Sequence, residues 1–303
     1  MADSPPKSVA NTAPAASKLL KPPKPPGARP DIATLGGIVV ALSGILGGLL
    51  LEKGSIQDVA QATAAMIVLG GTLGAVLVTT PLPVFVRACK RLSDAFLEKG
   101  SSTAATIDSL IRYATLARKN GIVSLESEAA AAPDPFLRKA LSLAVDGTDL
   151  QELRKMMELD SSLGELAAEA EAKVWEAAGG YSPTIGIIGA VMGLIQVMKN
   201  LEDIKAVGHG IAVAFVATLY GVALANIFFL PVANKLRGRA RAAVLLKDLV
   251  LEGVVGIVEG MNPTLIRLRL DAYNQDSRKP AKAKAAKAGA MPGLAGQPAP
   301  GER

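Results

Sequence analysis

The chain has 303 residues, of which 50% are hydrophobic but only 4% aromatic, and it carries a formal net charge of +6. Its mean hydropathy of +0.33 is high for a soluble protein, so a membrane protein is favoured over a soluble enzyme. The single cysteine, Cys89, excludes an intrachain disulfide, and the single histidine, His209, excludes a metal site built from several histidines. The basic residues flank the apolar stretches, so we attribute them to topology and to contact with anionic membrane lipid, and we expect no nucleic-acid binding.

The first part of the chain is predicted to contain a polar arm and two membrane-spanning helices. Residues 1–30 are rich in proline, alanine and lysine, a composition typical of a disordered cytoplasmic arm. The stretches Ile32–Leu51 and Val59–Leu82 contain no charged residue. About 20 residues at 1.5 Å per residue match the thickness of a bilayer core, so residues 31–83 are predicted to form transmembrane helices 1 and 2.

Residues 84–180 are dense in charge and in helix-forming residues, and they are too numerous for a loop. Glycine and proline divide this segment into candidate helices, and no run in it alternates with the two-residue period of a strand. We therefore predict a helical cytoplasmic domain. Its expected helices are Thr103–Asn120 before Gly121, Ser124–Ala132 before Pro133, Pro135–Val145 before Gly147, and Leu150–Ala178 before Gly179–Gly180.

A second pair of stretches without charge follows, Thr184–Met198 and His209–Val232. The first of them is short but spans a bilayer if Tyr181–Pro183 enters with it. Residues 181–234 are therefore predicted to form transmembrane helices 3 and 4. The predicted fold class is an all-α membrane protein with four transmembrane helices in two pairs and a helical cytoplasmic domain between the second and the third.

Two segments follow the last span. Residues 235–277 are predicted to contain a cytoplasmic C-terminal helix, Ala240–Gly260, and residues 278–303 are predicted to be a disordered tail. Lysine and arginine precede the first span and follow the fourth, whereas the two short loops within the pairs are nearly balanced in charge. Both termini and the central domain are therefore expected in the cytoplasm.

The second pair of spans contains few polar side chains that could touch an ion or water. These are Thr184, Thr218, Tyr220 and Asn226. The Thr218 hydroxyl can either bond to its own helix or line a pore, and the sequence leaves both roles open. The chain shows no constellation of residues for catalysis and no phosphate-binding loop, so we expect neither an enzyme nor a bound cofactor.

Two prolines mark a possible gate. Pro183 opens the third span and Pro231 nearly closes the fourth. Because these spans run in opposite directions, the two prolines are expected at the same cytoplasmic level. A proline at a helix start is common, whereas Pro231 would break a helix ladder and is the more informative of the two. We predict a flexible cytoplasmic mouth at this level.

Five sequence blocks together resemble the flagellar stator A subunit family (MotA/PomA), over Pro30 to Tyr273. The blocks are Asp31–Leu35, Leu69–Thr72 (LGGT), Ala117–Glu126 (ARKNGIVSLE), Ser182–Leu194 (SPTIGIIGAVMGL) and Ala214–Asn234 (AFVATLYGVALANIFFLPVAN). The resemblance implies a homo-oligomeric ring, a pentamer, in the bacterial inner membrane. It also implies a partner of MotB type, with one membrane span that carries the ion-binding carboxylate and a peptidoglycan-binding domain. The family contacts the flagellar rotor through charges that match Arg118 and Glu126.

The resemblance also bears on the transported ion. Sodium-driven members of the family carry threonines at the positions of Ala190 and Ala217, next to the threonine matching Thr218. Sodium needs replacement oxygen ligands and a proton does not, so the alanines favour H⁺ over Na⁺. We place the ion pathway at Thr218, Ala190, Ala217 and Tyr220. Two alternatives remain: an energiser of outer-membrane transport of the TolQ/ExbB kind, which usually has three spans, and a passive membrane scaffold.

Overall fold

The computed structural model describes residues 29–98 and 102–273, and within these ranges the chain is helical apart from two short paired strands. The predicted all-α class is confirmed. The predicted N-terminal arm and C-terminal tail lie almost entirely outside the described residues. The helices are α1 (Ile32–Leu51), α2 (Ile56–Val59), α3 (Ala62–Thr79), α4 (Leu82–Lys90), α5 (Leu92–Phe96), α6 (Thr103–Asn120), α7 (Glu126–Ala131), α8 (Pro135–Val145), α9 (Leu150–Lys199), α10 (Ile204–Ala223), α11 (Leu230–Val258) and α12 (Pro263–Leu270).

The remaining elements are short. Strands β1 (Arg29–Pro30) and β2 (Leu97–Glu98) pair antiparallel, so the residues before α1 lie beside the end of α5. Two 3-10 turns, η1 (Ile122–Leu125) and η3 (Asp271–Tyr273), precede α7 and follow α12. A π-helical segment, η2 (Leu224–Phe229), joins α10 to α11.

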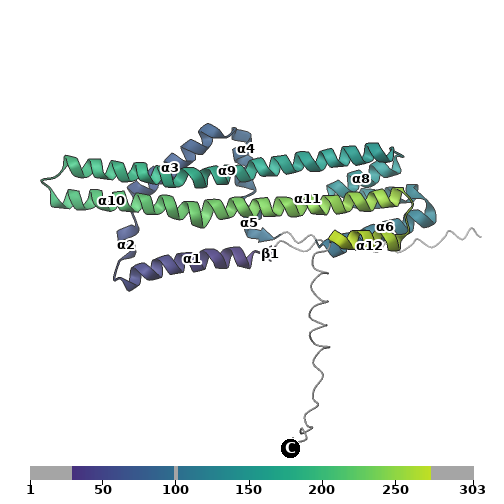
Figure 1. The fold of residues 1–303 in the computed structure, drawn as a ribbon, viewed down its shortest axis with the longest axis horizontal. Helices are drawn as coiled ribbons and strands as arrows, with labels where there is room; N and C mark the ends of the chain where they lie inside the picture. The colour runs from purple at the N-terminus through teal and green to yellow at the C-terminus, as the bar shows by residue number, and fades with distance from the viewer. Residues whose placement is uncertain (1–28, 99–101, 274–303) are drawn as a thin grey trace, which may run out of the picture.

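Two long helical rods form the axis of the molecule. Helix α9 contains 50 residues, which at 1.5 Å per residue is a length of about 75 Å. Helix α10, the π segment and α11 run on as a second rod of 55 residues from Ile204 to Val258. Figure 1 shows the rods side by side, with α3 crossing them and α6, α8 and α12 gathered at one end. Four helical stretches in the described residues are long and apolar enough to span a membrane, as predicted.

The predicted helix stop at Gly179–Gly180 is wrong, because α9 runs through both glycines. A glycine inside a helix costs only about 1 kcal/mol relative to alanine, and packing between the rods outweighs that cost. A Cβ atom at Gly179 would lie 2.6 Å from Cδ2 of Leu230, so the glycine is what lets α11 approach. The expected helix Ala240–Gly260 is likewise only the later part of α11.

The structure differs from the sequence prediction at one of the two prolines, Pro183. Pro183 lies inside α9, where a proline removes a backbone hydrogen bond, and it does not open a helix. Pro231 lies inside the continuous second rod, just after the π segment, so it removes a hydrogen bond from the helix ladder, as expected from the sequence. In the wide π turn the Leu230 N–H donates to the Ala225 carbonyl, five residues back, so the irregularity is absorbed just before the proline.

A hydrophobic core lies at the end of the molecule farthest from the α9–α10 loop. It joins α6 and α8 to the start of α9, the end of α11 and α12 (Figure 1). Full burial of each large side chain there contributes roughly 1.5–3 kcal/mol. The predicted central domain is therefore completed by the C-terminal part of the chain. The large core side chains include Ile107, Leu110, Leu141, Leu153, Met157, Leu249, Val254, Ile266 and Leu270.

Local sequence signals predicted the ends of two helices in this domain correctly. The predicted bounds of α6 and α8 are confirmed to the residue. Helix α6 ends because Gly121 adopts a φ of 82°, which favours glycine. The predicted helix Ser124–Ala132 is instead the 3-10 turn η1 followed by α7.

Candidate functional site

The close contact between α9 and α10 is made by small residues. Gly186 and Gly193 of α9 are buried against the backbone of α10. A Cβ atom at Gly186 would lie 2.9 Å from the Ala217 carbonyl oxygen, and one at Gly193 would lie 2.7 Å from the Gly210 carbonyl oxygen. We call this contact the seam, and its members are Ser182, Gly186, Gly189 and Gly193 on α9 and Gly210, Ala214, Ala217 and Gly221 on α10. Such stripes of small residues let helices associate in a membrane, where lipid offers no hydrophobic drive.

Helix α3 covers one side of the seam. Ala64 and Val68 of α3 form a buried cluster with Val216 and Ala217 of α10. The α9 side of the same contact is at Ile185, whose side chain would be 2.7 Å from a Cβ atom at Gly71. Val216 and Ile185 directly precede the seam residues Ala217 and Gly186, so α3 lies on that side of the α9–α10 pair and leaves the opposite side uncovered.

The uncovered side, called here the open face, consists of the residues that follow each seam position. Each residue turns an α-helix by about 100°, and in antiparallel helices the following residues project to the same side. Phe215 is 75% exposed there and Ile187 is 57% exposed. The open face is apolar apart from one hydroxyl, that of Thr218. Its members are Pro183, Ile187, Ala190 and Leu194 on α9 and Ile211, Phe215, Thr218 and Val222 on α10.

The structure thus brings three of the predicted residues together on the open face: Pro183, Ala190 and Thr218. The Thr218 hydroxyl donates to the Ala214 carbonyl at 3.2 Å, so the bond to its own helix is made. Both lone pairs on the hydroxyl oxygen stay free to accept a second contact, and the side chain is half-buried. Both roles considered for Thr218 are compatible with this position.

Ala217 and Tyr220 lie elsewhere. Ala217 is 0% exposed and sits in the seam, where its Cβ atom would be 2.7 Å from a Cβ atom at Gly189. The Tyr220 hydroxyl donates to the Val59 carbonyl and accepts from the Gln61 N–H at 3.3 Å. Tyr220 therefore fastens α10 to the loop before α3, on the side away from the open face.

The two prolines of the predicted gate point to different neighbours. Pro183 lies against α10, because a Cβ atom at Gly221 would be 3.2 Å from its Cα atom. Pro231 lines a cavity of about 340 Å³ between α1, α5 and the π segment. Gly179, one turn before Pro183, contacts Leu230, the residue before Pro231. The prolines are close in level along the rods but do not share a face.

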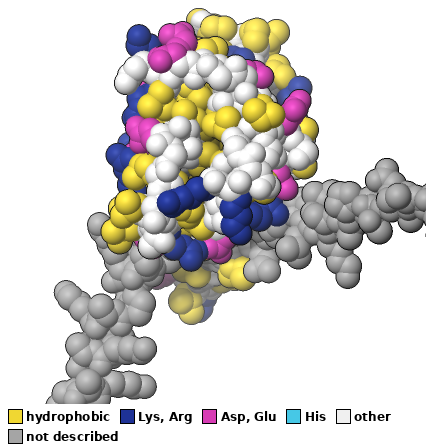
Figure 2. Space-filling model, turned by 90° about the vertical axis from the view of Figure 1, so that its right-hand side faces the viewer, with side chains coloured by type: hydrophobic (Ala, Val, Ile, Leu, Met, Phe, Trp, Pro, Cys, Tyr) yellow, Lys and Arg dark blue, Asp and Glu magenta, His cyan; other side chains and the backbone are white. Residues whose placement is uncertain are grey.

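The predicted rotor residues lie at the far end of the molecule. Arg118, in the last turn of α6, and Glu126, the first residue of α7, are both exposed. Neither forms an ion pair with another residue in the ranges that the structure describes. The neighbouring Arg112 is paired with Glu128 at 3.0 Å. Figure 2 shows that end of the molecule, where acidic, basic and hydrophobic side chains alternate.

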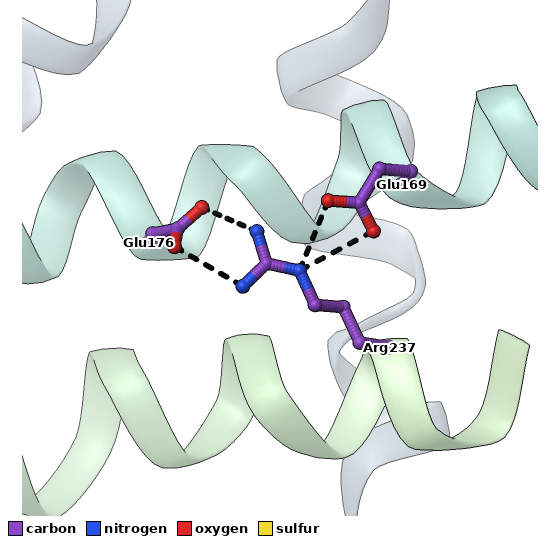
Figure 3. A network of polar contacts seen from close by, with 3 residues as sticks. All are labelled: Glu169, Glu176 and Arg237. Atoms are coloured by element: carbon purple, nitrogen blue, oxygen red, sulfur yellow. Dashed lines mark hydrogen bonds and ion pairs between the residues drawn. The ribbon is translucent and has the colours of Figure 1, made fainter. Parts of the chain in front are cut away.

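A set of charged residues at the other end of this domain was missed by the sequence prediction. In Figure 3, Arg237 of α11 lies between Glu169 and Glu176 of α9. Asp31, the N-cap of α1, pairs with Lys235 at 2.5 Å and with Arg239 at 3.1 Å. We call the full set the ionic belt. It comprises Asp31, Arg87, Arg91, Glu169, Glu171, Glu176, Lys235, Arg237 and Arg239.

Two acids of the belt, Asp31 and Glu176, have lowered pKa values, which favours their ionised forms. The hydrogen bond from Lys235, with help from the Thr34 backbone N–H, lowers the pKa of the Asp31 carboxyl far below its ordinary value. The hydrogen bond from Arg237 lowers the pKa of Glu176 and raises that of the guanidinium. The sequence analysis used Lys235, Arg237 and Arg239 only as signals of membrane topology. Among the described residues, no three His, Cys, Asp or Glu side chains are grouped so as to hold a metal ion.

Comparisons with known proteins agree with this geometry. Residues 35–121 match the family model "Motility protein A N-terminal", and residues 128–248 match that of the MotA/TolQ/ExbB proton channel family. Motility protein A of Helicobacter pylori is 33% identical over 243 residues, covering 80% of this chain and 95% of that protein.

Two solved structures share the fold. The structure of C. jejuni MotAB has a TM-score of 0.76 and 31% identity, with 80% of this chain and 95% of that chain covered. The flagellar MotAB stator complex from Bacillus subtilis has a TM-score of 0.75 and 31% identity, with 85% and 100% covered. The likeness therefore extends over both helix pairs and the domain between them.

Proposed function

This chain belongs to the Motility protein A family, and on that premise we propose that it is the A subunit of a flagellar stator. With a MotB-type partner it forms an ion channel whose current drives rotation of the flagellum. The structures that share its fold are MotAB complexes, which supports the pairing. It is a multi-pass membrane protein, and its role is that of a channel and motor component.

The open face is the observation that carries this proposal. It is an apolar surface on two membrane helices, with Phe215 75% exposed and one hydroxyl, that of Thr218, at its centre. No Asp, Glu, Lys or Arg lies on it. A single apolar helix of the partner fits this surface and supplies the carboxylate that binds the ion, while this chain supplies the wall of the pathway.

The remaining surfaces agree with a membrane ring. Helix α1 has no buried residue in the single chain, which supports its coverage by neighbouring copies and lipid in a homo-oligomer, a pentamer in our proposal. The basic residues that precede α1 and those between Lys235 and Lys247 of α11 support an orientation in the bacterial inner membrane with both termini and the α6–α8 region in the cytoplasm.

Torque passes from the pathway to the flagellar rotor along the two rods. Moving one charge through 100 mV releases about 2.3 kcal/mol, so each ion supplies enough energy to shift a helix contact. In this proposal the exposed charges Arg118 and Glu126 meet the rotor, at the opposite end of the rods from the α9–α10 loop. The coupled ion is H⁺ rather than Na⁺, because Ala190 and Ala217 offer no oxygen beside Thr218.

Deletion of the chain tests the proposal. We expect cells that still build flagella but do not swim, with motility restored when the wild-type chain is expressed together with its partner. Normal swimming of the deletion strain, combined with a loss of energised uptake across the outer membrane, would instead support the TolQ/ExbB-like function. Normal swimming together with normal uptake would favour the passive scaffold.

A further inference from the structure

The first link of the ionic belt joins the two long rods. The Arg237 Nε–H donates to both carboxylate oxygens of Glu169, at 3.0 and 3.3 Å. One terminal N–H group donates to Glu176 at 3.1 Å, and the other also bonds to that carboxylate. Glu169 and Glu176 are seven residues apart, so one guanidinium grips about two turns of α9 (Figure 3). Its planar fork holds the rods in one register along their length.

The second link lies on the other side of α11. Lys235 and Arg239 are one turn apart and both bind Asp31, which is 9% exposed and caps α1. The Asp31 N–H donates to the Phe96 carbonyl at 2.8 Å, and Arg239 also donates to the Leu97 carbonyl. This link therefore fastens α1 and the end of α5 to α11.

The third link fastens α4 to α9. Glu171 is 5% exposed and lies 3.1 Å from Arg91 and 3.7 Å from Arg87. Glu171 is two residues from Glu169, so the two acids face different neighbours on the same stretch of α9. The three links together join four helices in the order α4, α9, α11 and α1.

The belt lies directly beside the irregular part of both rods. Lys235 follows Pro231 by one turn, and Glu176 precedes Pro183 by two turns. The π segment ends just before Pro231. Prolines and π segments are the places where helices bend. The rods thus have a flexible level, and immediately beyond it a level where charge pairs fix them to one another.

We propose that the ionic belt makes α9 and α11 move as one body beyond the flexible level and ties α1 and α4 to them at the belt, with Arg237 as the positioning residue that prevents α9 and α11 from sliding past each other. This inference rests on the proposed stator function. Packed helices shift against one another by about 1–2 Å in conformational changes, and an unpinned pair would absorb an imposed displacement in that way. Pinned rods deliver the displacement to α6 and α7 instead.

This role differs from a contribution to folding. The side chain of Glu176 is 47% exposed, and exposed salt bridges stabilise proteins by only about 0–1 kcal/mol. Glu176→Gln should therefore fold normally and still loosen the grip of Arg237 on α9. Arg237→Gln removes both pairs, leaving Glu169 and Glu176 without their cation.

The experiment compares torque at high and low load. Arg237→Gln, Glu176→Gln and the control Glu158→Gln are each expressed with the partner in a strain without the chain. Glu158 is also an exposed α9 acid with an arginine partner, Arg154, and lies outside the belt. Membrane levels, ion flux into the cells and the torque–speed curve of single motors are measured.

We expect all three variants to reach the membrane and conduct ions. Zero-load speed should stay at the wild-type value, while stall torque falls with Glu176→Gln, falls further with Arg237→Gln and does not change with Glu158→Gln. A folding defect would instead lower the membrane level and the speed at every load. Wild-type stall torque in a membrane-inserted Arg237→Gln motor would overturn the inference and leave the stator function standing.

If Arg237→Gln does not reach the membrane, Glu176→Gln decides the question. Wild-type stall torque with Glu176→Gln would then contradict the belt as a mechanical link. Failure of the proposed function has a different signature, since a strain that lacks the whole chain would then swim normally.

Discussion

Arg118 and Glu126 are the exposed charges that the resemblance assigns to the rotor contact, and the structure leaves both without an ion pair among the described residues. Arg112, by contrast, is already paired with Glu128. We predict that the double variant Arg118→Glu, Glu126→Arg abolishes swimming, because charge contacts between proteins guide engagement more than they stabilise the fold. The membrane level and ion flux should be those of the wild type.

The measurement is swimming speed together with quantitation of the chain in membranes. Reversed charges on the rotor protein should restore part of the motion. If the double variant swims at wild-type speed, Arg118 and Glu126 do not transmit torque, and other surface charges such as Lys119 would become the candidates.

The raised pKa of Asp248 leads us to expect that the stability of the protein depends on pH. Burial, followed by the nearby carboxylates of Glu165 and Glu158, raises its pKa above the ordinary value. In the folded chain the ionised form is therefore disfavoured. Stability should rise as the pH falls from neutral through the raised pKa, and this gain should end below the ordinary pKa, where both states are protonated. Asp248→Asn should accordingly unfold at a higher temperature than the wild type at neutral pH.

Thermal unfolding of the detergent-solubilised protein checks this at neutral and mildly acidic pH. The advantage of Asp248→Asn should shrink as the pH falls. Glu202→Gln, which removes an exposed charge in the α9–α10 loop, is the matched control and should show no such trend. An advantage that does not depend on pH would mean that the gain comes from packing rather than from ionisation.

At the scale of the elements, the proline inside α9 leads to a specific prediction. Pro183 removes a backbone hydrogen bond inside α9, and a proline in a helix interior costs roughly 3 kcal/mol. Pro183→Ala should therefore stabilise the protein or leave its stability unchanged, and it should stop rotation, because a continuous ladder stiffens the flexible level. Motility assays and thermal unfolding of the same variant measure the two effects.

Pro263→Ala is the control for this variant. Pro263 is at the start of α12, where the missing N–H costs nothing, so both stability and motility should stay close to the wild type. If Pro183→Ala rotates normally, bending at this proline is not part of the motor cycle. If it is lost from the membrane, the proline has a structural role and the gate is again not supported.

The elements that the sequence predicted best are those with local end signals. Helix α8 begins where Asp134 accepts from the Phe136 N–H at 2.9 Å, and the two residues needed for that cap are only two positions apart in the sequence. The continuity of α9 could not be predicted in this way. It depends on the contact of Gly179 with Leu230, and no local rule on glycine contains that contact.

The same distinction applies to the site. Thr218, Ala190 and Pro183 could be found from small-residue spacing and family motifs, and the structure places them on one face. Tyr220 and Ala217 belong to the same sequence motif as Thr218, but Tyr220 faces α3 and Ala217 lies in the seam. These positions depend on how three helices pack. The ionic belt was out of reach altogether, because Arg239 and Asp31 are 208 residues apart in the chain.

For the whole molecule the open question is which ion drives it, and we propose H⁺. A sodium ion must exchange its water for oxygen ligands, whereas a proton can pass along a narrow water chain to a carboxylate. The open face offers one hydroxyl oxygen, that of Thr218, whereas a sodium ion needs several oxygen ligands in place of its water. Ala217 is fully buried in the seam, so a threonine introduced there would have to displace the backbone contact with Gly189 before it could reach an ion.

We therefore predict that swimming stops when a protonophore collapses the proton gradient and that its speed does not depend on external sodium at fixed pH. A sodium-channel inhibitor should have no effect. The matched control is a strain in which the chain and its partner are replaced by a sodium-driven stator pair, which should show the opposite responses in the same buffers. Speed that rises with external sodium, or swimming that survives the protonophore, would contradict the ion assignment, while the stator function, the open face and the belt would be unaffected.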